Sequence, residues 1–344
     1  MNRRIAIWLV VAVAIVAVSL AVVFRAFSAA PASQSGGADL TTMLAQPHYV
    51  FVDQSVANRD EIGVVPASNP QADHKFLSTQ RCDRVSARSS LIVCLRTVPS
   101  GKASEGTVFD VKSDGTLAIV RAFPLTGVPS RATISPDLKN TAATVFEPGP
   151  VKGGEEYSDV GGFTTRTSIH SVVPGGKDYL DLAKDFVVVK DGRTFKPKEM
   201  NVWGVTFSPT DPDRFYVTVE SGGGHWLSEG SFRTGQIVLG HPNVECPSIS
   251  PDGKRIGYKF PLGDGTWRLH VLNLQTHEDR ALDETRNIDD QIQWINDQTI
   301  MYQFRTVQPG ADSKTDVWSI DIQPGSQPGM LISNANSPSY VQGS

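Results

Sequence analysis

Short stretches of alternating apolar and polar residues run through this chain from about residue 45 to the C-terminus. Residues 256–260 read Ile-Gly-Tyr-Lys-Phe and residues 300–304 read Ile-Met-Tyr-Gln-Phe, which places one residue in two on a buried face. Such a period of two predicts β-strands. Proline and glycine are spread along the whole region, and after the N-terminal segment no stretch predicts a helix of three turns. The pattern therefore indicates an all-β fold.

A turn motif recurs between these strands. Residues 134–137 read Ile-Ser-Pro-Asp, residues 207–210 Phe-Ser-Pro-Thr and residues 249–253 Ile-Ser-Pro-Asp-Gly. Serine, proline, aspartate and glycine suit successive positions of a tight turn between two strands. The last two copies lie 42 residues apart, and the first two lie 73 apart, which leaves room for one unit with a long loop. A period of about 40–50 residues with four short strands predicts a β-propeller.

The repeat divides the chain into six units, which predicts a six-bladed propeller. The expected units begin near His48, Cys82, Ser130, Val202, Pro247 and Gln291. Seven blades remain an alternative, because residues 187–198 have room for an extra strand pair. We also expect residues 340–341 near the C-terminus, or residues 49–52 near the start, to complete a blade shared by both ends of the chain.

The N-terminus predicts export. Arg3 and Arg4 precede an uncharged, apolar stretch of 20 residues, from 5 to 24, which is long enough to span a bilayer as a helix. We therefore expect a signal-anchor or transmembrane segment over residues 1–26, a flexible tether over 27–44 and the propeller over 45–344. The arginines should stay in the cytoplasm, which leaves the propeller outside the cytoplasmic membrane. A cleaved signal peptide and a secreted propeller are the alternative.

Three cysteines fit an exported protein. Cys82 and Cys94 flank an expected hairpin turn at residues 88–90 and would lie roughly opposite one another, so we predict a disulfide between them, with two buried thiols as the alternative. Cys246 is left over at the start of a core strand. It is most simply read as a small buried hydrophobic residue, with a reactive or intermolecular thiol as the alternative.

The net charge and the absence of known motifs argue against several classes of function. The net charge is −4 with no basic stripe, which argues against nucleic-acid binding. No histidine or cysteine spacing matches a zinc site, and no nucleophile elbow is present. The acidic pairs at 211–213 and 289–290 are interpreted as turn chemistry and a solvated loop. The sequence thus predicts no catalytic residue, metal or cofactor.

Two long loops are the candidate contact regions. Residues 147–167 carry Glu155, Glu156 and Tyr157, and residues 220–234 carry a glycine run followed by His225 and Trp226. Insertions at one point of a repeat usually lie on one face of a propeller, often the binding face. These five residues are therefore candidate partner contacts, the glycine run being a candidate anion-binding nest. The alternatives are a solvated loop and a flexible hairpin.

The motif also carries a family resemblance. Residues 250–254 read Ser-Pro-Asp-Gly-Lys, and an aromatic strand and then Leu-His-Val-Leu-Asn-Leu at 269–274 follow. This unit resembles the WD40-like (PD40) repeats of the TolB β-propeller, and most of residues 45–340 shares the pattern. The chain resembles an exported TolB-like protein of an actinobacterial type, without the α/β domain that precedes the propeller in TolB. The resemblance implies protein–protein contact in the cell envelope, made by loops and the channel mouth, but the motif specifies the blade and not the function.

We therefore expect a non-catalytic, membrane-tethered propeller that mediates protein–protein interaction or scaffolding in the cell envelope. Its expected partner is an envelope protein or peptide, and we expect a monomer. The alternative is an envelope hydrolase or lyase that acts on glycan or peptide in the propeller funnel. A sensor of small ligands is a third reading, which requires a closed apolar pocket.

Overall fold

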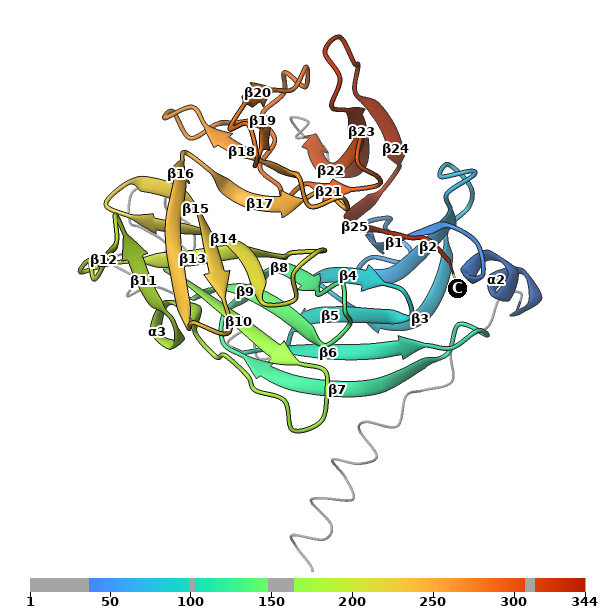
Figure 1. The fold of residues 1–344 in the computed structure, drawn as a ribbon. Coiled ribbons are helices and arrows are strands. Elements are labelled where there is room, and N and C mark those ends of the chain that lie inside the picture. Colours follow the sequence, from blue (N-terminus) through green and yellow to red (C-terminus); the bar gives the residue numbers. More distant parts are fainter. Residues whose placement is uncertain (1–36, 99–102, 148–163, 307–312, 344) are drawn as a thin grey trace, which may run out of the picture. The chain divides into compact units, whose positions relative to one another are not determined.

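The fold is seen in a computed structural model, which describes residues 37–98, 103–147, 164–306 and 313–343. These residues form six sheets arranged in a ring, with strands β4, β8, β13, β17, β21 and β25 toward the centre (Figure 1). The predicted six-bladed, all-β propeller is confirmed.

The strands are assigned to the blades in the order from the centre outward. Blade 1 contains β25 (Ala335–Val341), β1 (His48–Asp53), β2 (Glu61–Pro66) and β3 (Lys75–Arg81). Blade 2 contains β4 (Arg84–Arg88), β5 (Leu91–Thr97), β6 (Ser104–Val111) and β7 (Leu117–Leu125). Blade 3 contains β8 (Val128–Ile134), β9 (Asn140–Glu147) and β10 (Thr164–Ser171). Blade 4 contains β13 (Asn201–Phe207), β14 (Arg214–Ser221), β15 (Gly224–Ser231), β16 (Gln236–Pro242), β11 (Val187–Lys190) and β12 (Arg193–Thr194). Blade 5 contains β17 (Glu245–Ile249), β18 (Arg255–Pro261), β19 (Trp267–Asn273) and β20 (Asp279–Ala281). Blade 6 contains β21 (Gln293–Trp294), β22 (Thr299–Thr306), β23 (Lys314–Asp321) and β24 (Gly329–Ile332).

The two ends of the chain close the ring together, as predicted. The C-terminal strand β25 is the innermost strand of blade 1 and pairs antiparallel with β1, so that Tyr340 faces Tyr49 and Val341 faces His48. Both expected segments therefore contribute to the shared blade. Closure of this kind removes two free sheet edges, which would otherwise expose unpaired backbone groups.

The extra strand pair belongs to blade 4, and blade 3 gains nothing from it. Residues 187–198 do hold two short strands, but β11 joins blade 4 by running parallel to β16, and β12 pairs with β11. The seven-blade alternative is therefore wrong, because the added pair extends an existing sheet to six strands. Blade 3 keeps three strands among the described residues.

The outer edge of the three-stranded blade is capped by the segment that follows it. Ile169 of β10 exchanges two backbone hydrogen bonds with Tyr179. The Ser171 N–H donates to the Asp178 carboxylate and the Thr165 N–H donates to the Asn201 side chain. These groups satisfy the donors that a fourth strand would take. Blade 3 thus has a capped edge.

Between blades 2 and 3, a buried histidine makes stability depend on pH. The ring of His170 stacks on Phe123 at 3.8 Å and is 1% exposed. Burial lowers its pKa, although Asp178 acts in the opposite direction, and Arg121 adds to the lowering. The folded state therefore binds the proton less readily than the unfolded state, so this group's contribution is present above about pH 6.5 and is lost as the pH falls. We expect the wild type to lose more stability between pH 7 and pH 5 than His170→Gln, as measured by urea unfolding; equal losses would contradict this role.

The Ser-Pro-Asp turns form one face of the ring, which we call the turn face. In the copy at residues 250–253, Ser250 Oγ donates to Asp252 and accepts from the Arg255 N–H, and Gly253 has φ of 72°. The Asp252 N–H reaches the Asp297 carboxylate in blade 6. The turns therefore also join neighbouring blades. The opposite face, where the innermost strands begin and the β18–β19 loop (262–266) lies, is called the mouth face.

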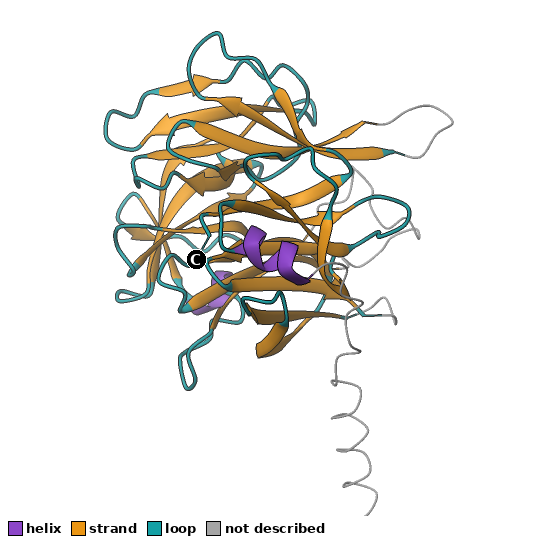
Figure 2. Cartoon of the chain, turned by 90° about the vertical axis from the view of Figure 1, so that its right-hand side faces the viewer, coloured by secondary structure: helices purple, strands orange, loops and turns teal. Residues whose placement is uncertain are grey.

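A short helix at the start of the described chain replaces part of the predicted tether. Helix α2 spans Gly37–Leu44 and buries Leu40, Met43 and Leu44 in the core shared by blades 1 and 2. It lies on the turn face, because Leu40 packs close to Gly115 in the β6–β7 turn. The flexible tether predicted to reach residue 44 is thus wrong for this part. Figure 2 shows the helix near the C-terminal end, where Gly343 approaches the backbone of Gln46.

The predicted transmembrane segment, residues 1–26, lies outside the described residues. Within the part of the chain that the structure describes, no helix has the length and apolar character to cross a membrane.

The predicted disulfide joins Cys82 and Cys94, with their Cα atoms 5.5 Å apart. The expected register was wrong: Cys94 pairs with Val85 across the β4–β5 hairpin, and Cys82 lies in the connection that enters blade 2 from β3. Both cysteines lie in the same core as α2. The bond therefore ties the start of blade 2 to its second strand.

Candidate functional site

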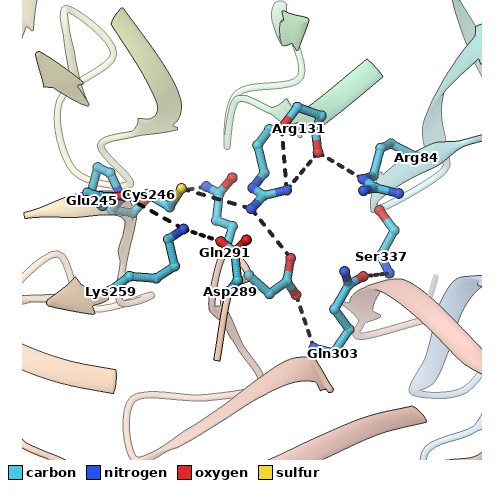
Figure 3. A network of polar contacts seen from close by, with 12 residues as sticks. Arg84, Arg131, Glu245, Cys246, Lys259, Asp289, Gln291, Gln303 and Ser337 are labelled. Carbon is cyan, nitrogen blue, oxygen red and sulfur yellow. Dashed lines mark hydrogen bonds and ion pairs between the residues drawn. The ribbon is translucent and has the colours of Figure 1, made fainter. Parts of the chain in front are cut away.

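The mouth of the central channel collects polar side chains from five blades (Figure 3). A pocket there is lined by residues of the innermost strands and the segments that precede them: Arg84, Val85, Ser130, Arg131, Ala132, Asp290, Gln291, Gln293, Ser337 and Pro338. These residues come from blades 1, 2, 3 and 6, and blade 5 adds a charged cluster beside them. The site therefore depends on ring closure.

Irregular backbone shapes this mouth. Gly204 in β13, Cys246 in β17 and Ser337 in β25 all have positive φ, of 71°, 51° and 51°. The pairing of each of these strands with the next one shifts register close to that residue. Bulges of this type bend a strand and redirect its side chains.

Arg131 holds one side of the cluster. Its guanidinium lies 3.7 Å from Asp290 Oδ1 and 3.9 Å from Cys246 Sγ, and it donates to the Ser130 carbonyl. Asp290 also accepts the Gln303 N–H and is 8% exposed at its side chain. Burial raises the pKa of Asp290, and attraction to Arg131 opposes that rise. The sequence had suggested a solvated loop for this aspartate, which is wrong.

Lys259 lies on the other side of the charged cluster. Its side chain is 4% exposed, and Nζ lies 2.5 Å from Asp289 Oδ1 and 3.7 Å from Glu245 Oε2. The same Nζ stands 4.3 Å from the centre of the Trp267 ring. Burial alone would lower the pKa of Lys259, but Cys246, Asp289 and Glu245 outweigh it and raise the pKa. The strand pattern had placed this lysine opposite the buried face, yet it is buried and paired at the mouth.

Asp289 differs from its neighbours in exposure. Its side chain is 61% exposed, against 9% for Glu245 and 8% for Asp290. Burial by surrounding protein would raise its pKa, but attraction to Lys259, Arg131 and Arg84 outweighs this and lowers it. Asp289 is thus ionised and accessible.

Three backbone N–H groups of the innermost strands β4 and β17 donate to hydroxyl groups of a neighbouring blade. The Val85 and Ala87 N–H groups donate to Ser337 and Ser339 hydroxyls of the adjacent β25, and the Cys246 N–H donates to the Thr218 hydroxyl. Hydroxyl side chains thus link neighbouring blades where no sheet pairing exists.

The loop predicted over residues 220–234 is wrong. Strand β14 continues to Ser221, only Gly222 and Gly223 form the turn, and β15 begins at Gly224. The Gly223 N–H donates to the Glu220 carboxylate, so the predicted nest is filled by the chain itself. The glycine run suggested a flexible loop because a tight hairpin turn has the same composition.

Of the predicted contact residues, His225 and Trp226 lie at the mouth-face end of β15. His225 Nε2 is 3.5 Å from Glu245 Oε1, which connects it to the Lys259 cluster. Trp226 packs instead with Lys190 Nζ, 4.4 Å from its ring, near the added strands of blade 4. Glu155, Glu156 and Tyr157 lie outside the described residues. Their role in contacts stays a prediction.

A serine, an aspartate and a histidine also meet in blade 1, but in an order that does not suit nucleophilic catalysis. The Asp53 carboxylate accepts from both Ser55 Oγ and His74 Nδ1, so it lies between them. A catalytic triad needs the histidine in the middle, where it can take the proton of the hydroxyl. In the described residues no group of three His, Cys, Asp or Glu side chains is placed to hold a metal ion.

A comparison with the solved structure of a TolB protein supports the fold. The structure is similar to TolB from Acinetobacter baumannii, with a TM-score of 0.59 and 12% identity, over 87% of this chain and 67% of that one. A puromycin-hydrolysing peptidase from Mycobacterium tuberculosis matches with a TM-score of 0.39 and 13% identity, over 83% of this chain and 43% of that one. No protein-family model matches the sequence, and no curated protein matches it. The chain folds as a TolB-like propeller, as its repeats predicted.

Proposed function

We propose that this TolB-like propeller is a non-catalytic binding module of the cell envelope, which docks a segment of a partner protein at its mouth face. The observation that carries this proposal is the charged cluster at the channel mouth, where Lys259, Arg131 and their acidic partners are held by separate blades. A closed ring presents such groups rigidly, which lowers the entropy lost on binding. The mouth is thus a preformed polar surface.

The location in the envelope rests on two further features. The apolar residues 5–24 and the preceding arginines have the composition of a membrane anchor. The Cys82–Cys94 bond is of a kind that persists in oxidising compartments. Both support an exported propeller tethered to the cytoplasmic membrane.

The hydrolase alternative has less support from the same site. A general acid needs both access to the substrate and a pKa near the working pH. Asp290 has a raised pKa but is buried against Arg131, whereas Asp289 is accessible but has a lowered pKa. Neither carboxyl combines the two properties, so the geometry favours binding over hydrolysis.

Photo-crosslinking in intact cells tests the proposal. A benzoylphenylalanine at position 262 probes the mouth face, since Leu262 is 51% exposed in the β18–β19 loop. The matched control is position 233 in the β15–β16 turn on the turn face, where the side chain is 80% exposed. We expect a discrete partner band from 262 and none from 233. The same bands from both positions, or none from 262, would overturn the proposal.

A further inference from the structure

The charges at the mouth balance only while Asp289 stays in place. Three cations, Arg84, Arg131 and Lys259, stand near three acids, Glu245, Asp289 and Asp290. Glu245 and Asp290 are buried and fixed, whereas Asp289 is exposed. If its carboxylate swung away, Lys259 would keep a buried positive charge with Glu245 at 3.7 Å as its remaining close acid. An unbalanced buried charge is costly, so a replacement anion would be favoured at that position.

The position of the Asp289 carboxylate is set by three blades. Its hydrogen bond comes from Lys259 of β18 in blade 5. Arg131 of β8 and Arg84 of β4 contribute longer-range attraction from blades 3 and 2. An anion at this point is therefore attracted by residues of three different blades.

We propose that Asp289 is a built-in substitute for a carboxylate of the partner, and that an acidic peptide segment displaces it from Lys259 when the partner docks. This inference rests on the proposed function and names the chemistry of its partner. The Asp289 side chain competes with the incoming carboxylate. The apparent affinity for the peptide is therefore the intrinsic affinity multiplied by the fraction of molecules in which Lys259 is free of Asp289. The contact is thus autoinhibitory.

The surroundings select one negative charge of small size. The Trp267 ring lies 4.3 Å from Lys259 Nζ, so part of the ammonium surface is already covered. Glu245 and Asp290 remain nearby after displacement and repel a second charge on the same group that enters beside Lys259, whereas the other carboxylates of a peptide can lie farther out. A monoanionic carboxylate fits this balance better than a phosphate dianion or a nucleic-acid backbone.

A titration with tri-aspartate tests the inference on the complete chain. Isothermal calorimetry at low ionic strength compares the wild type with Asp289→Asn, which keeps a hydrogen-bond acceptor but removes the competing charge. We expect Asp289→Asn to bind tri-aspartate about tenfold more tightly than the wild type does. The matched control is Asp264→Asn, which removes the same charge from the exposed β18–β19 loop without touching Lys259. Its affinity should stay within about twofold of the wild type.

Several outcomes are decisive. Equal gains in the two single variants would overturn the inference, because the effect would then be general electrostatics. Adding Lys259→Gln to Asp289→Asn should abolish the gain in affinity for tri-aspartate. If this double variant has a normal melting transition and still shows the gain, the inference is overturned. If the double variant fails to fold, the comparison of Asp289→Asn with Asp264→Asn decides alone. Crosslinks from position 262 without any tri-aspartate gain would reject this inference and leave the proposed function standing.

Discussion

Deletion of residues 336–344 is expected to lower the melting temperature by at least ~10 °C or to abolish the cooperative transition. The deletion removes most of β25, which pairs with β1 and packs against β4. It also removes the Ser337 and Ser339 hydroxyls that accept the Val85 and Ala87 N–H groups, so these buried donors lose their partners. Differential scanning calorimetry measures the effect.

The matched control is deletion of residues 342–344, which leaves β25 whole. We expect the melting temperature of this variant to stay within ~2 °C of the wild type, since few buried groups are lost. If the longer deletion melted like the shorter one, the ring would not depend on the shared blade.

Substitution of Gly230 by alanine is expected to cost about 3 kcal/mol in the free energy of unfolding. Gly230 of β15 faces Phe215 of β14, and a Cβ atom there would lie 2.1 Å from the Phe215 ring. Phe215 is fully buried and packs on Phe186, so its ring has little room to move. The same glycine–phenylalanine contact recurs between Gly63 and Phe51.

Gly329→Ala serves as the comparison, since a Cβ at this exposed position in β24 meets no heavy atom within 4 Å. Its free energy of unfolding should change by less than about 0.5 kcal/mol in urea titrations. A loss for Gly230→Ala no larger than that of Gly329→Ala would show that the Phe215 ring can shift, against the tight packing seen here.

The blades were predictable because their signals are local. A turn such as residues 250–253 has its serine, proline, aspartate and glycine next to one another, and each contributes to the same few hydrogen bonds. The alternation of Ile256 and Tyr258 is equally local, and both side chains are fully buried. The shared blade was predictable for a related reason, since a ring leaves the two end strands no other partner.

The candidate site was not predictable in the same way, because its contacts join blades far apart in the sequence. Lys259 looked like the polar member of an alternating strand, and only the neighbouring acids of blades 5 and 6 explain its burial. Asp290 looked like part of a solvated loop until Arg131, from blade 3, was placed beside it. A lysine between two aromatic residues of a strand is the signal that points to such a site, but it does not identify the partner.

The position of the C-terminal end has a consequence for how the protein can be immobilised. The described chain begins at Gly37 and ends near Gly343, with both ends on the turn face. A purification tag or linker fused after β25 is therefore attached at the turn face, opposite the channel mouth. A sample immobilised through its C-terminus is thus attached on the face away from the charged cluster, which leaves that cluster accessible to a probe.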